Sequence, residues 1–139
     1  MTRARPSHPD DGGTGDGGAG DRGSVSVEMV VLMPLLLLIV FLGVQGAVYY
    51  YARSLAIAAA QEGARAAALP NSTLTDGRSA AGAFLTDTAG NSLQAVTITG
   101  TRTATTATIT VHGSSLTLIP GWTPTLTQTA SLPVERITR

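Results

Sequence analysis

The sequence predicts an α+β protein with a long N-terminal helix, a short second helix and a small antiparallel sheet of about four strands. Two observations carry this prediction. Residues 29–51 form a nearly unbroken apolar run, which continues into an Ala-rich stretch with no helix breaker before Pro70. Beyond Pro70, β-branched residues alternate with threonine in short segments bounded by Gly and Pro, a pattern typical of half-buried strands.

Composition changes sharply along the 139 residues and predicts four parts. Residues 1–23 are a Gly/Asp-rich leader with almost no apolar side chains to offset the entropy of ordering, and are expected to be disordered. Residues 24–51 are predicted to form a transmembrane helix, and residues 52–69 a helical extension that projects from the membrane. Residues 70–139 are predicted to form a small extracytoplasmic α+β domain.

The apolar run from Met29 to Tyr51 has the length of a membrane span. Its 23 residues are interrupted only by Gln45, and as a helix they would extend roughly 35 Å across a hydrocarbon core of ~30 Å. Pro34 removes one backbone hydrogen bond and is predicted to bend the helix. Aromatic and basic residues follow in the order expected at a membrane–water interface. This predicted interface belt consists of Tyr49, Tyr50, Tyr51 and Arg53.

Glu28 stands at the head of the apolar run and admits two interpretations. In the first, it lies at the interface in the first helical turn, where the helix dipole favours an acid by ~0.3–1 kcal/mol. In the second, it lies within lipid, where an unpaired charge costs roughly 2.5–3.5 kcal/mol. Cleavage between Gly23 and Ser24 would then free an α-amine, and the amine of a neighbouring subunit would neutralise Glu28. The residues alone leave both interpretations open.

The segments "RGSVSVEMVVLMPLLLLIVFLG" and "YYYARSLAIAAAQEGARAAAL" together resemble the TadE-like proteins, minor pilin-like components of tight-adherence (Flp-type) pilus systems. The resemblance rests on Gly23, on Glu28 five positions later, on the early Pro34 and on the motif "QEGARA". It continues more loosely to "ASLPVERI", which is similar to the family's closing strand. It implies that a prepilin peptidase cleaves after Gly23, that Ser24 is the first mature residue and that Glu28 is the charge used in assembly.

The resemblance also implies partners and a location. The partners would be the membrane, the prepilin peptidase, the Flp-type major pilin with other pilin-like subunits, and an inner-membrane assembly platform. The protein would cross the cell membrane once, with a cytoplasmic N-terminus and an extracytoplasmic C-terminal domain, and could enter a surface appendage. The arginines near the span do not support this orientation by the positive-inside rule. Arg22 alone precedes the span closely, while Arg53 and Arg65 follow it.

Composition argues against several other classes of function. All nine basic residues are arginines and none adjoins another, whereas a nucleic-acid surface needs clustered positive charge. The chain has no cysteine, and its two histidines lie in different segments, so neither a metal site nor a cofactor site is expected. Asp76, Asp87 and Glu135 are isolated, so no catalytic site is expected and the protein is not predicted to be an enzyme. Trp122 and the Thr-rich faces are interpreted as packing and solvated surface.

The remaining elements follow from caps and alternation. A second helix is predicted from Gly77 to Thr88, with Thr75 or Asp76 as its cap and Gly90 ending it. The predicted strands are "QAVTITG", "ATITVHG", "SLTLIP" and "TQTASLPVERI", and Pro133 places the last of them at an edge. A sheet of this size needs the projecting helix to complete its core.

The predicted function is therefore structural: a pilin-like membrane protein in the assembly or anchoring of a tight-adherence type pilus or secretion system. The alternative is a single-pass membrane anchor that is never cleaved and carries an envelope-binding domain.

Overall fold

A computed structural model of the chain describes residues 20–135, with side chains from Val27 onward. Two helices precede three strands in the order α1, α2, β1, β2, β3. The chain divides into two compact units that meet in sequence between Leu38 and Ile39. Most of the leader predicted to be disordered, residues 1–19, lies outside the described residues, as do residues 136–139. The elements are α1 (Gly20–Ala68), α2 (Leu74–Thr88), β1 (Leu93–Arg102), β2 (Thr106–Ser115) and β3 (Thr125–Pro133).

Helix α1 extends over 49 residues and continues through Pro34. It begins at Gly20, four residues before the predicted start at Ser24. It ends at Ala68 because Pro70 follows, and the residue before a proline is biased away from helical backbone angles. Between these ends, Leu and Ala, which favour helices, outnumber the β-branched residues.

Helix α2 begins at Leu74, three residues before the predicted start, and its N-cap is Thr73 rather than Thr75 or Asp76. The backbone N–H of Asp76 donates to the Thr73 hydroxyl (3.2 Å), and the backbone N–H of Thr73 donates to the Asp76 carboxylate (2.7 Å). This reciprocal capping box satisfies two donors that a helix start otherwise leaves unpaired. The predicted end at Thr88 is correct.

The sheet has three antiparallel strands in the order β1-β2-β3, not four. The predicted strand "SLTLIP" is instead the start of the loop between β2 and β3, residues 116–124. Pairing ends where Ser115 meets Leu93 and Ser114 meets Thr125, and Gly121, with φ of 81°, turns the chain back. Strand β3 is an edge strand, as Pro133 predicted, but it ends at this proline, whereas the predicted strand "TQTASLPVERI" continued beyond it.

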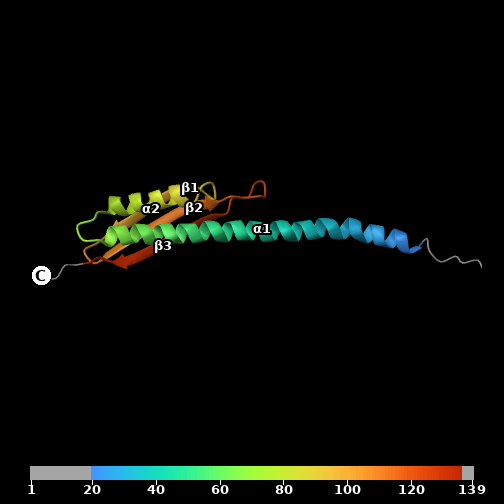
Figure 1. The fold of residues 1–139 in the computed structure, drawn as a ribbon, viewed down its shortest axis with the longest axis horizontal. Helices are drawn as coiled ribbons and strands as arrows, with labels where there is room; N and C mark the ends of the chain where they lie inside the picture. The colour runs from blue at the N-terminus through green and yellow to red at the C-terminus, as the bar shows by residue number, and fades with distance from the viewer. Residues whose placement is uncertain (1–19, 136–139) are drawn as a thin grey trace, which may run out of the picture. The chain divides into compact units, whose positions relative to one another are not determined.

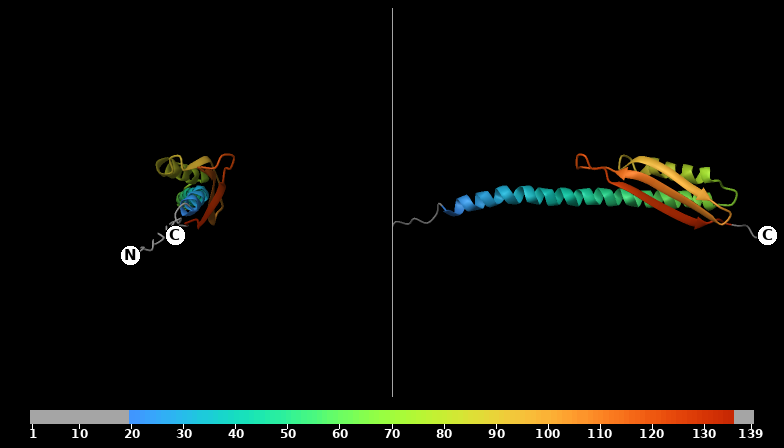
Figure 2. Two further views of the ribbon diagram at one scale, coloured as in Figure 1. Left: turned by 90° about the vertical axis from the view of Figure 1, so that its right-hand side faces the viewer. Right: turned by 180° about the vertical axis from the view of Figure 1, so that it is seen from behind.

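The second half of α1 and α2 pack against one face of the sheet, side by side (Figures 1 and 2). The inward side chains of β2 alternate with threonines and are fully buried: Ala107, Ile109 and Val111. Opposite them, α1 contributes mostly alanines to the core, namely Ala52, Ala56, Ala59, Ala60 and Ala64. The sheet therefore completes its core with α1, as the sequence predicted.

Two glycines let α1 and α2 approach closely. A Cβ on Gly63 would lie 2.7 Å from the carbonyl oxygen of Gly77 and 2.9 Å from the Cβ of Ala81. A Cβ on Gly77 would meet the Gly63 carbonyl oxygen at 2.7 Å. Because neither position has room for a side chain, these glycines set the distance between the helices.

Donors from outside the helix bind the carboxyl end of α1. The Nε of Arg102 donates to the Ala67 carbonyl oxygen at 2.7 Å, and the Ser72 hydroxyl donates to the same oxygen at 2.9 Å. The backbone N–H of Glu135 donates to the Ala68 carbonyl oxygen at 3.0 Å. A cation and two further donors thus satisfy carbonyls that have no partner within the helix.

Candidate functional site

The first half of α1 exposes an apolar surface in which almost every large side chain is uncovered. The side chains of residues 29–42 are exposed throughout, including those of Leu, Ile, Val, Met and Phe. Soluble monomers rarely leave so large a contiguous apolar surface open. From Val27 to Ala68, α1 is long and apolar enough to cross a membrane, and its most apolar part is not covered by any of the described residues.

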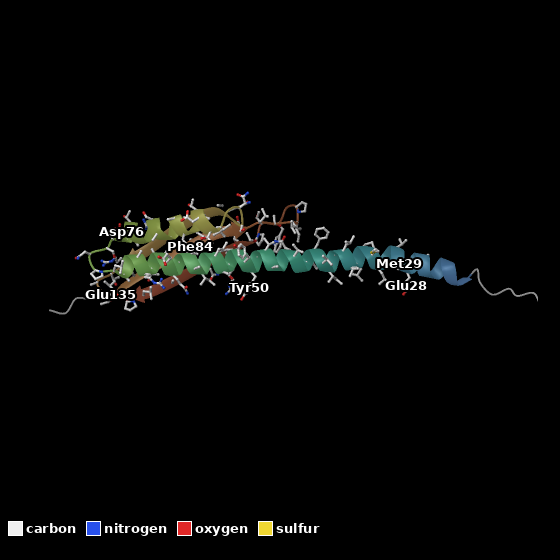
Figure 3. All side chains as sticks on the ribbon, in the orientation of Figure 1. Glu28, Met29, Tyr50, Asp76, Phe84 and Glu135 are labelled. Carbon is white, nitrogen blue, oxygen red and sulfur yellow. The ribbon has the colours of Figure 1, made fainter. Side chains whose placement is uncertain are left out.

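Glu28 heads this surface and its side chain projects outward from α1 (Figure 3). Among residues 27–135, the ion pair that forms is Arg65 with Glu62, at 3.4 Å on the other half of the helix. No side chain within this described range makes an ion pair with Glu28.

The predicted cleavage position lies inside α1, since the helix includes Gly23 and Ser24. Two of the predicted belt tyrosines, Tyr50 and Tyr51, are exposed, and Arg53 is exposed as well. Tyr49 differs, because its ring packs against the hydrophobic core. The roles of these residues, and the bend at Pro34, stay predictions.

Gln45, the polar interruption of the apolar run, is 96% buried although Val44 and Gly46 beside it are exposed. The β2–β3 loop covers it. Its Nε2 donates to the Leu116 carbonyl oxygen at 3.2 Å, and its Oε1 accepts from the Leu118 backbone N–H at 2.7 Å. The amide thus pairs with both a donor and an acceptor of the loop backbone.

One carboxylate with a shifted pKa, that of Asp76, lies at the start of α2 and away from this surface. At the start of α2, the backbone N–H of Thr73 and then its hydroxyl hold the pKa of Asp76 below its usual range. Among the side chains of residues 27–135, no three of His, Cys, Asp or Glu gather in a way that could hold a metal ion.

The exposed apolar surface and Glu28 lie within a segment that matches a known protein family. Residues 23–65 match the model of the TadE-like protein family. The match begins at Gly23 and includes Glu28, so the resemblance that the sequence suggested is confirmed. No curated protein and no solved structure matches the chain.

The TadE-like segment contains Gln45, but sequence reasoning missed its partner. A signal was present, because a polar side chain inside an apolar span is expected to find a hydrogen-bond partner. The partner itself lies 71 residues further along the chain, where "SLTLIP" was assigned to a strand. Trp122, predicted to pack, is instead about half exposed in the same loop.

Proposed function

We propose that the chain is a structural, pilin-like membrane protein that acts in the assembly or anchoring of a tight-adherence type pilus or secretion system. The TadE-like match suggests a pilus-associated protein. The observation that carries the proposal is a coincidence in position: the matched segment contains the exposed apolar surface of α1 and the acid at its head.

The proposed chemistry concerns the neutralisation of Glu28. A prepilin peptidase would hydrolyse the peptide bond between Gly23 and Ser24, leaving an α-amine on Ser24. With a pKa near ~7.7–8.0, this amine is largely charged at neutral pH. Paired with Glu28 of an adjacent subunit, it would offset the roughly 2.5–3.5 kcal/mol that an unpaired carboxylate costs in lipid.

The proposed arrangement follows from this processing. The N-terminus would lie in the cytoplasm and residues 70–139 outside it, with Tyr50, Tyr51 and Arg53 at the outer interface. The partners would be the peptidase, the Flp-type major pilin, other pilin-like subunits and the inner-membrane assembly platform. The exposed side chains of residues 29–42 support a lipid or helical neighbour along this part of α1.

One observation favours the second candidate function, an uncleaved single-pass anchor with an envelope-binding domain. Helix α1 begins at Gly20, so the bond between Gly23 and Ser24 lies in helical backbone. A peptidase would have to unwind this turn before it could reach the bond. An uncleaved chain would instead keep its leader.

N-terminal sequencing of the protein purified from membranes separates the two functions. A mature chain that begins at Ser24 supports the pilin-like function. An intact leader on protein taken from an assembled appendage contradicts cleavage and favours the anchor.

The substitution Glu28→Ala tests the assembly charge. We expect the variant to insert into the membrane as the parent does but to recover much less major pilin on affinity purification. Glu62→Ala is the matched control, because Glu62 is an acid on the same helix outside the exposed surface. Equal recovery of pilin by Glu28→Ala and the parent would contradict the proposed role.

A further inference from the structure

We propose that the β2–β3 loop, residues 116–124, enters the lipid bilayer beside the membrane-spanning part of α1. This inference rests on the proposed function only in requiring that α1 cross a membrane. The loop extends past the end of α2 along α1 (Figures 1 and 2). Gln45 ties it to the helix through the two hydrogen bonds to Leu116 and Leu118.

The depth of the attachment follows from helix geometry. Gln45 precedes Arg53 by eight residues, which places it roughly 12 Å further along the helix axis. Each interfacial zone of a bilayer is only about 5–8 Å thick. If Arg53 reaches the headgroups or water, Gln45 and the loop backbone bound to it lie at the edge of the hydrocarbon core.

The side chains of the loop suit that depth. Four large apolar residues of the loop are exposed, whereas most large apolar residues elsewhere in the domain are buried or half-buried. They are Leu116, Leu118, Ile119 and Trp122. No Asp, Glu, Lys or Arg occurs between Arg102 and Glu135, so the whole hairpin could approach lipid without burying a charge. Tryptophan is moreover enriched at the membrane interface.

Part of the loop backbone is paired within the protein, as a medium without water requires. The Ile119 N–H donates to the Thr117 hydroxyl at 3.1 Å, and the Trp122 N–H donates to the Ile119 carbonyl oxygen at 3.3 Å. Pro120 and Pro124 have no N–H to satisfy. Irregular backbone is tolerated at membrane depth only where its polar groups are paired within the protein. Gln45 supplies that pairing for Leu118, which explains a polar residue in the middle of an apolar run.

A lipid occupant fits better than a second protein because the exposed loop continues an exposed apolar helix. Phe41, Leu42 and Val44 lie within one helical turn of Gln45 and are themselves uncovered. The same medium that covers them would cover the loop. A second copy of the chain remains an outcome of the experiment below.

Trp122 is the single tryptophan of the chain and can report on the loop directly. The full chain is reconstituted at one copy per nanodisc of phosphatidylcholine and phosphatidylglycerol, with acyl chains brominated near the headgroup or near the methyl end. We expect blue-shifted Trp122 emission that is quenched more strongly by the shallow bromines than by the deep ones.

Two relocated tryptophans serve as matched controls. In W122F/F41W the reporter lies on the span, and we expect strong quenching. In W122F/T101W the reporter lies on β1, at the end of the sheet that is far from Ser115 and the loop, and we expect no quenching. Quenching at position 41 without quenching of Trp122 would overturn the loop inference and leave the span intact. Absence of quenching at both positions would overturn the span as well.

Two variants test whether the Gln45 hydrogen bonds and the apolar side chains of the loop place it in the bilayer. Gln45→Leu removes both hydrogen bonds, and Leu118→Asp places a charge in the loop; each is expected to lower the quenching of Trp122. Neither residue belongs to the hydrophobic core, so circular dichroism should show the sheet retained. Emission that is blue-shifted, insensitive to bromine and dependent on the number of copies per disc would overturn the inference, because a second copy would then cover the loop.

Discussion

The two halves of α1 place their side chains in opposite ways. In the first half the large apolar residues are exposed, as Leu36 and Phe41 illustrate at 56% and 59%. In the second half the buried residues are mostly alanines, and Ala56, Ala60 and Ala64 have no exposed surface at all. A helix in water would bury the large side chains and expose the small ones.

This difference indicates two different surroundings along one helix. Large side chains gain most from leaving water, so the first half indicates an apolar medium that the described residues do not supply. The second half is surrounded by α2 and the sheet, and small residues allow those elements to approach closely. Substitutions of matched type on the two halves should therefore differ in their effect on stability.

The largest expected effect comes from adding a side chain to a glycine of each half. Gly63→Leu should lower the free energy of unfolding by about 3 kcal/mol, the upper end of the overpacking range, because its Cβ already meets Gly77 and Ala81. Gly43→Leu should not lower it, since a Cβ there meets nothing within 4 Å and Leu favours helix. Hydrogen exchange of the β2 amides in nanodiscs measures both. Equal losses would refute the contrast between the halves.

An intermediate effect is expected at the end of the buried half. Arg102→Met should cost about 1.5–3 kcal/mol, because it removes a charged donor from the Ala67 and Leu69 carbonyl oxygens. Arg102→Lys should recover only part of this loss, since an ammonium cannot reproduce the forked geometry of the guanidinium. The control Arg78→Met removes an exposed arginine of α2 and should change stability by less than about 0.5 kcal/mol. The same exchange measurement checks all three.

The smallest effect concerns the start of α2, which covers the buried half. Thr73→Ala should cost about 1 kcal/mol by removing the cap, whereas Thr75→Ala, exposed in the same turn, should cost nothing.

The capping box also makes the stability of α2 depend on pH. The folded pKa of Asp76 lies below its unfolded value of ~3.9. The contribution of its carboxylate is therefore present above the unfolded pKa and is lost as the pH falls through the folded one. Urea unfolding of the parent between neutral and strongly acidic pH should show this loss. Asp76→Asn should flatten that part of the profile, and an unchanged profile would contradict the assignment.

Local patterns predicted much of the fold. The length of the apolar run, the alternation of Ile109 and Val111 with threonines, and the edge position of Pro133 depend on residues close together in sequence. The start of α2 was misplaced by three residues because Thr73, Thr75 and Asp76 all qualify as caps by type. Only the backbone angles of Thr73, extended at φ −115° and ψ 167°, distinguish them.

By itself the sequence determined that one helix carries an apolar span with Glu28 at its head and an Ala-rich stretch behind it. Periodicity and composition suffice for that, since they act within a few helical turns. Tertiary structure alone decided that Gly63 meets Gly77, that Arg102 binds the end of α1, and that "SLTLIP" bonds to Gln45 instead of forming a strand. These contacts join residues between 14 and 73 positions apart, and their free energy depends on folded distances that no local pattern encodes.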